Sequence, residues 1–150
     1  MKRSRQLTVS PGSIVRLFSE EEAHQLAADW LSVFGKNSSD ANAQAFLWHV
    51  FSGGRYPSSE GEKAKKEYKE QIGNQFIVLS NDRKQALLTN LLPSSASFFD
   101  YYVFPPSLAW TMCFTHEAGW LGPYFARHPN YVELDRKARE AAHAREQGWY

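Results

Sequence analysis

Short apolar runs divide the second half of the chain, and each run ends at a turn cluster or at proline. Runs of this length bounded by such residues are typical of β-strands. They predict strands at 75–79 and 101–104, with 109–115 as the partner of the second strand beyond Pro105 and Pro106. The run 86–92 fits a strand or a short helix equally well. The chain is therefore expected to contain a sheet.

The segment from Ser19 to Phe34 predicts the clearest helix. Ser19 and Glu22 form a capping box, in which each side chain can bond the other residue's backbone N–H. Apolar residues then recur at helical spacing, including Trp30, and Gly35 is expected to end the helix in a left-handed conformation. We expect Trp30 and Phe34 to pack on the sheet.

Three further elements are expected. Residues 45–51 are apolar and aromatic and predict a buried strand before Gly53. Ser59 and Glu62 repeat the capping-box pattern and predict a second, largely exposed helix. A narrow apolar stripe would run along this second helix, at Ala64, Tyr68 and Ile72. Residues 132–147 are mostly charged and predict a C-terminal helix that Gly148 would end.

This order of elements predicts an α+β fold, in which a mixed or antiparallel sheet has helices packed on one side. A length of 150 residues suits a single domain. We expect a basic N-terminal arm at 1–18, an α+β core domain at 19–129 and a peripheral C-terminal helix at 130–150. The simplest interpretation of the arm is that it is a flexible, solubilising tail.

Charge and composition limit the classes of function. The formal net charge is +1, whereas a dedicated nucleic-acid binder usually needs a clearly basic face. No apolar stretch reaches the length of a membrane span, and the basic start of the chain is not followed by a signal-peptide pattern. One cysteine, Cys113, cannot form an internal disulfide. We expect a soluble, cytoplasmic protein that does not bind membranes. Nucleic-acid binding through the basic arm is the least favoured class of function.

Two segments combine rare residues. One is Trp-His-Val-Phe-Ser at 48–52, and the other runs from Trp110 to Glu117 and is followed by Gly-Pro-Tyr-Phe at 122–125. In these segments the chain resembles a family of small bacterial proteins classed only as a domain of unknown function. The family shares W-H-x-F-S and W-T-x-x-x-T-H-E segments followed by G-P-Y-F. The resemblance covers residues 20–125 and implies positions of interest but no activity.

His49, His116 and Glu117 are the candidate catalytic residues, because histidine exchanges protons near neutral pH and a neighbouring carboxylate fixes its tautomer. The alternative interpretation is that they are ordinary polar residues at strand ends. Trp120 stands where a zinc protease helix needs its second histidine, so that motif is excluded, and we expect no metal and no cofactor.

Four residues are candidates for binding a ligand or partner: Trp48, Ser52, Trp120 and Tyr124. Tyrosine and tryptophan are frequent at partner surfaces, although core packing is the simpler interpretation. We expect Ser52 to lie near the two histidines and the Glu117 carboxylate at one end of the sheet, with Trp120 and Tyr124 forming one wall of a shallow pocket.

No nucleophile elbow, phosphate-binding loop, dinucleotide fingerprint or zinc deaminase signature is present in the sequence. Cys113 lies between apolar residues and is expected to be buried and inert. A small protein-binding or inhibitory module of the immunity type is therefore the leading hypothesis. The alternative is a small enzyme or ligand-binding protein that uses the His/Glu residues. The sequence leaves both the presence of catalysis and the oligomeric state open.

Overall fold

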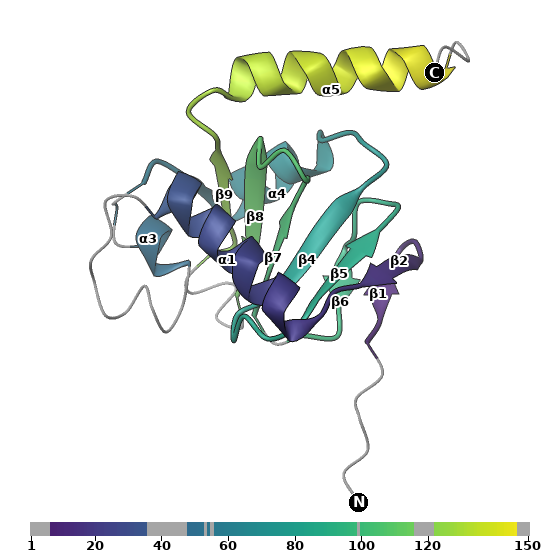
Figure 1. Cartoon of the computed structure of the whole chain (residues 1–150). Helices are drawn as coiled ribbons and strands as arrows, with labels where there is room; N and C mark the ends of the chain where they lie inside the picture. The colour runs from purple at the N-terminus through teal and green to yellow at the C-terminus, as the bar shows by residue number, and fades with distance from the viewer. Residues whose placement is uncertain are drawn as a thin grey trace, which may run out of the picture.

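A computed structural model describes residues 7–35, 48–52, 54, 56–98, 100–115 and 122–146 of the chain (Figure 1). Its centre is a seven-stranded sheet in the order β2-β5-β4-β7-β8-β9-β3. All the pairings of this sheet are antiparallel. The strands are β2 (Ile14–Leu17), β3 (Ser59–Glu60), β4 (Phe76–Ser80), β5 (Ala86–Thr89), β7 (Tyr101–Phe104), β8 (Trp110–Phe114) and β9 (Tyr124–Arg127). The α+β prediction is confirmed.

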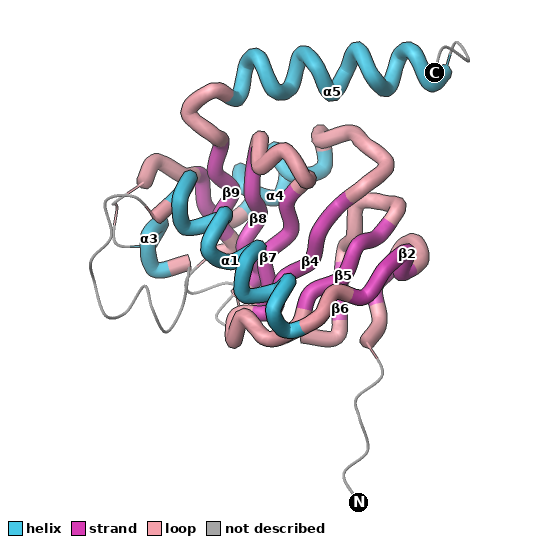
Figure 2. The backbone as a smooth tube through the Cα atoms, in the orientation of Figure 1, coloured by secondary structure: helices cyan, strands magenta, loops and turns pink. Residues whose placement is uncertain are grey.

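The helices lie on both faces of this sheet, because the strands are apolar on both sides. Ile77 and Leu79 of β4 face a core cluster that also holds the buried residues of α1 (Glu20–Phe34) and α3 (His49–Ser52). Phe76 and Val78 face the opposite cluster, which includes buried residues of α4 (Glu62–Lys69). The class is as expected, but the placement of all helices on one side is corrected. Figure 2 shows α1 in front of the strands, α3 to the left of α1, and α4 behind the strands.

Helix α1 begins as the sequence predicts. Ser19 caps it, with the Glu22 amide donating to Ser19 Oγ at 3.1 Å and the Ser19 amide donating to Glu22 Oε1 at 2.9 Å. The hydrogen bond from the Ser19 backbone is the main cause that lowers the pKa of Glu22. Trp30 and Phe34 are buried against the sheet, as expected. Gly35 does end the helix, but its φ is −109°, so the expected left-handed conformation is wrong.

Two other local predictions are wrong. The described end of the segment 45–51 forms helix α3, in which the Phe51 amide donates to the Trp48 carbonyl at 3.0 Å. A short apolar run has no periodicity that separates a buried strand from a buried helix. Ser59 does not cap α4, since Gly61 stands at that position with φ 67° and no side chain caps the helix. Ser59 lies in β3 instead, and α4 ends at Lys69, so Ile72 falls outside it.

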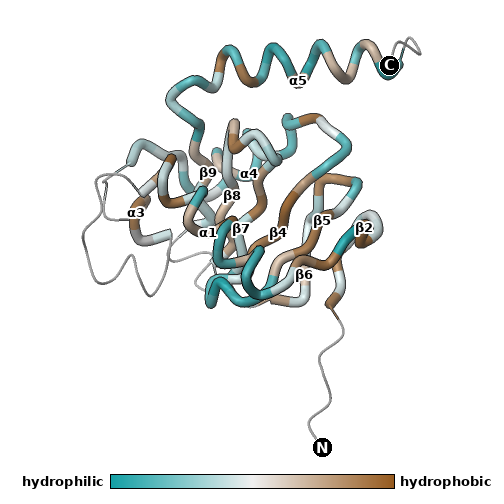
Figure 3. Tube along the Cα trace, viewed as in Figure 1, coloured by the Kyte–Doolittle hydropathy of each residue, from teal (hydrophilic) through white to brown (hydrophobic). Residues whose placement is uncertain are grey.

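Several strand predictions are correct. Residues 76–80, 101–104 and 110–114 are strands, and β7 pairs with β8. The ambiguous run at 86–92 contains strand β5, which ends at Thr89. Figure 3 shows that the hydrophobic positions concentrate on the central strands.

The two ends of the described chain add peripheral elements. Part of the expected N-terminal arm is ordered as strands, because β1 (Val9–Ser10) pairs with β6 (Ser95–Ala96) and β2 pairs with β5. At the other end, α5 (Tyr131–Glu146) is a helix, as predicted, and has no buried residue. Figure 1 shows α5 running across the top of the domain. Only Tyr131 and Leu134 pack, half-buried, against the cluster beside α4.

Candidate functional site

Trp48 and Tyr124, two of the predicted binding residues, lie together in the core. Each side chain is 2% exposed, and their rings stack with centroids 6.0 Å apart. The indole N–H of Trp48 donates to Asp100 Oδ2 at 3.1 Å. Its backbone N–H donates to the Tyr102 hydroxyl, which itself donates to Asn81 Oδ1. These bonds join α3 to the start of β7 at one end of the sheet.

The structure describes the other predicted residues only in part. His49 and Ser52 belong to α3, where the structure describes their backbone, whereas His116, Glu117 and Trp120 lie outside the described residues. The described flanks of the two segments do converge. Trp48 bonds Asp100, and β8, which leads to residue 115, pairs its last residue with Tyr101. A shared His/Glu site at this end of the sheet stays a prediction.

Cys113 is fully buried on β8 beneath α1. Burial is the main cause that raises the pKa of its thiol well above the ordinary value, and the Asp100 carboxylate raises it further. A hydrogen bond with Thr111 acts in the opposite direction. The thiol is therefore protonated at neutral pH and out of reach of a substrate, so a nucleophilic role does not suit it.

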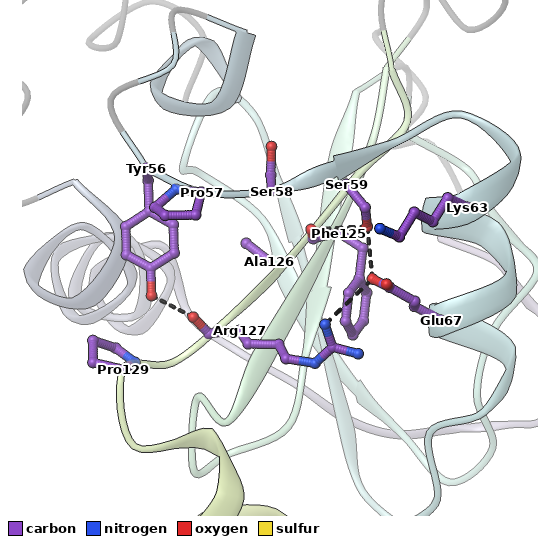
Figure 4. Close-up of a pocket in the computed structure, with 10 residues that line it drawn as sticks. All are labelled: Tyr56, Pro57, Ser58, Ser59, Lys63, Glu67, Phe125, Ala126, Arg127 and Pro129. Carbon is purple, nitrogen blue, oxygen red and sulfur yellow. Dashed lines mark hydrogen bonds and ion pairs between the residues drawn. The ribbon is translucent and has the colours of Figure 1, made fainter.

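A surface pocket of about 490 Å³ lies between α4, β9 and the chain that leads into β3 (Figure 4). Three separate segments of the chain supply its walls. The lining residues are Tyr56, Pro57, Ser58, Ser59, Lys63, Glu67, Phe125, Ala126, Arg127 and Pro129. Within the described part of the chain, no group of three or more His, Cys, Asp or Glu residues is arranged to hold a metal ion.

Arg127, at the end of β9, supplies the main cationic group of this pocket. Its guanidinium lies over the rings of Phe125 and Tyr131, with its central carbon 5.4 and 4.9 Å from the two ring centroids. Its nearest acid is Glu67, at 3.6 Å between Nη1 and Oε2, which is longer than a hydrogen bond. The guanidinium thus donates no hydrogen bond to any side chain or backbone group in the described ranges, although it is held by two rings.

Ser59 and Tyr56 hold the surroundings of Arg127 in place. Ser59 Oγ donates to Glu67 Oε2 at 2.6 Å, which orients the carboxylate, and the Glu67 side chain is only 15% exposed. Tyr56 donates its hydroxyl proton to the carbonyl of Arg127. Burial raises the pKa of Tyr56, so this hydroxyl stays protonated and remains a donor. The strand end is therefore tied to the segment before β3.

Lys63 adds a second cation from the first turn of α4. Figure 4 shows its side chain extending from the helix toward Ser59 and β9. Its ammonium makes no ion pair or hydrogen bond within the described ranges. The pocket has a net charge of +1, because Lys63 and Arg127 are cations and Glu67 is an anion.

Little in the sequence indicates this pocket. Arg127 is the last residue of β9 (Tyr124–Arg127) and follows three apolar residues, and an arginine in that place is the one local signal of a polar function. Its partners come from positions 56, 59, 63 and 67, which no motif connects with residue 127. Rare tryptophans and histidines drew the prediction toward the segment of Trp48, which is buried in the core.

The fold and this pocket define a small α+β domain whose surface carries a cationic cleft beside an aromatic wall. A family model described as a domain of unknown function (DUF4275) matches residues 21–125. The chain belongs to this family, as the resemblance in its sequence implied. No curated protein and no solved structure matches the chain. Among the described residues, no helix has the length and apolar character needed to cross a membrane.

Proposed function

We propose that the protein is a binding module for a protein partner and that the pocket around Arg127 is its contact site. One observation carries this proposal: the Arg127 guanidinium lies over two rings and the Arg127 carbonyl accepts a hydrogen bond from Tyr56, yet the hydrogen-bond donors of the guanidinium are unused by the described chain. Arginine and tyrosine are among the residue types that contribute most to protein interfaces. A preorganised arginine also loses little conformational entropy when it binds.

The exposure of the pocket favours a protein over a small ligand. Pro57, Ser58, Lys63, Arg127 and Pro129 are all exposed residues on its walls. Sites for small molecules usually bury most of the ligand surface, which walls this open do not provide. A side chain that projects from a larger partner would bring its own surroundings to close the pocket.

The finer parts of the proposal concern the setting. We take the protein to be bacterial and cytoplasmic and the binding to be inhibitory, as in immunity proteins. The small size of the domain and the lack of a complete catalytic motif in its sequence support this class. The buried, free thiol of Cys113 suits a reducing compartment.

The test begins with affinity capture of a partner, followed by calorimetry with that partner purified. Arg127→Ala is expected to weaken binding by at least about tenfold, the loss typical of an interface hot spot. Arg136→Ala is the matched control, because Arg136 is similarly exposed and ion-paired but lies on α5 outside the pocket. Equal affinities of wild type and Arg127→Ala for the purified partner would overturn the proposal.

A ligand-binding or acid/base site formed by His49, His116 and Glu117 is the second candidate. The observation that favours it is the convergence of its described flanks around Asp100, to which Trp48 is bonded. Trp48, which precedes His49, is buried in the core, whereas the Arg127 pocket lies at the surface beside β9. The two candidates can therefore be distinguished by which residues respond to binding.

A further inference from the structure

We infer that the pocket recognises a carboxylate group of the partner, either an acidic side chain or a chain terminus. This inference rests on the proposed function and adds the chemistry of the group that the pocket receives.

The donors have the geometry for a carboxylate. The five N–H groups of a guanidinium lie in its plane and form a fork that matches two carboxylate oxygens. The central carbon of the Arg127 guanidinium lies 4.9 and 5.4 Å from the centroids of two aromatic rings. Rings in this position leave the donors at the edge of the guanidinium available. Lys63 lines the same cavity and can donate to a remaining oxygen lone pair.

The charge of the pocket favours a monovalent anion over a phosphate dianion. Lys63 and Arg127 supply two positive charges, and Glu67 removes one. A carboxylate would make the set neutral, whereas a dianion would leave one uncompensated negative charge beside a carboxylate that is only 15% exposed. We therefore expect carboxylate probes to bind more tightly than inorganic phosphate at equal ionic strength.

Glu67 acts as an internal competitor for the arginine. Its Oε2 lies 3.6 Å from Arg127 Nη1, close enough for attraction but too long for a hydrogen bond. Ser59 holds that oxygen at 2.6 Å, so the acid stays beside Arg127 without occupying its donors. Removing the charge of Glu67, while keeping an oxygen for Ser59 to bond, should make the pocket bind a carboxylate more tightly.

The experiment is an NMR titration of the ¹⁵N-labelled full chain that follows the arginine Nε–Hε and backbone amide signals. The probes are the capped peptides Ac-Ala-Glu-Ala-NH₂ and Ac-Ala-Ala-Ala-OH, which present a side-chain and a terminal carboxylate respectively. Ac-Ala-Gln-Ala-NH₂ and inorganic phosphate are the controls. We expect saturable shifts at Arg127 with at least one carboxylate peptide, weaker binding of phosphate and none of the glutamine peptide.

The variants give the decisive contrast. Arg127→Gln should abolish the saturable shifts and Arg136→Gln should leave them unchanged. Glu67→Gln should raise the affinity by at least about fivefold, the size of one charge interaction across about 4 Å in water. Absence of saturation with both carboxylate peptides, tighter binding of phosphate, or weaker binding by Glu67→Gln would overturn the inference. If Arg127→Ala weakens binding of the purified partner while neither carboxylate peptide binds, this inference fails and the proposed function stands.

Discussion

Trp30 connects helix α1 to the sheet through both its ring and its one polar atom. The ring lies 5.2 to 5.6 Å from the rings of Phe34, Phe51 and Tyr102. Its indole N–H donates to Thr111 Oγ1 on β8 at 2.9 Å, so a fully buried donor is satisfied. Burial of a large apolar surface without an unpaired polar group is the most favourable arrangement for a core tryptophan.

Replacing Trp30 by alanine should therefore lower the free energy of unfolding by about 3 to 5 kcal/mol. The change leaves a cavity under α1 and removes the hydrogen bond that Thr111 accepts from the indole. Urea unfolding followed by circular dichroism measures the loss. Leu17→Ala is the control, because Leu17 is 59% exposed and should change stability little. An unchanged unfolding midpoint for the Trp30 variant would contradict this packing.

At the scale of elements, local signals predicted structure where the interaction is itself local. The capping box of α1 joins Ser19 and Glu22, three residues apart, and the sequence is enough to identify it. The same pattern failed at Ser59, because the Ser59 hydroxyl bonds Glu67 and the residue itself pairs with Phe125 of β9. These partners are distant from Ser59 in the sequence. They decide whether the residue caps a helix or joins a strand, and the local motif does not contain them.

Helix α5 shows how few contacts a peripheral element needs. Its charged residues pair mainly within the helix, as Arg139 does with Asp135 at 2.9 Å. Its links to the body include the half-buried Tyr131 and Leu134, the contact of the Tyr131 ring with the Arg127 guanidinium, and a hydrogen bond of 3.3 Å from Gln71 Nε2 to the Tyr131 hydroxyl. A 16-residue helix is marginal in water on its own, so these contacts at its first turn support it.

A chain that ends at Asn130 should still fold, with a loss of about 1 to 3 kcal/mol from two partly buried side chains. It should also bind a carboxylate probe more weakly, because Tyr131 no longer contacts the Arg127 guanidinium. Circular dichroism, urea unfolding and the peptide titration measure the three effects. An aggregated or unfolded product would show that α5 belongs to the core or to an interface between copies.

At the scale of the whole molecule, the α+β class followed from the runs of apolar residues, but the pocket did not. Its walls come from 56–59, 63–67 and 125–129, which meet only because β3 pairs with β9 and α4 packs beside them. Trp48 and Tyr124, chosen from their rarity, are buried in the core cluster on the α1 side of the sheet. Rarity does not separate a core aromatic from a surface one, whereas the register of the sheet does.

The most direct test of the binding account is amide chemical-shift mapping of the ¹⁵N-labelled protein with its purified partner. The account predicts that the perturbed amides cluster at residues 56–59, 63–67 and 125–129 and that Arg127→Ala removes these changes. Changes confined to the region of Trp48, Asp100 and Tyr102 would instead place binding at the predicted His/Glu end of the sheet. That result would contradict the assignment of the Arg127 pocket as the contact site.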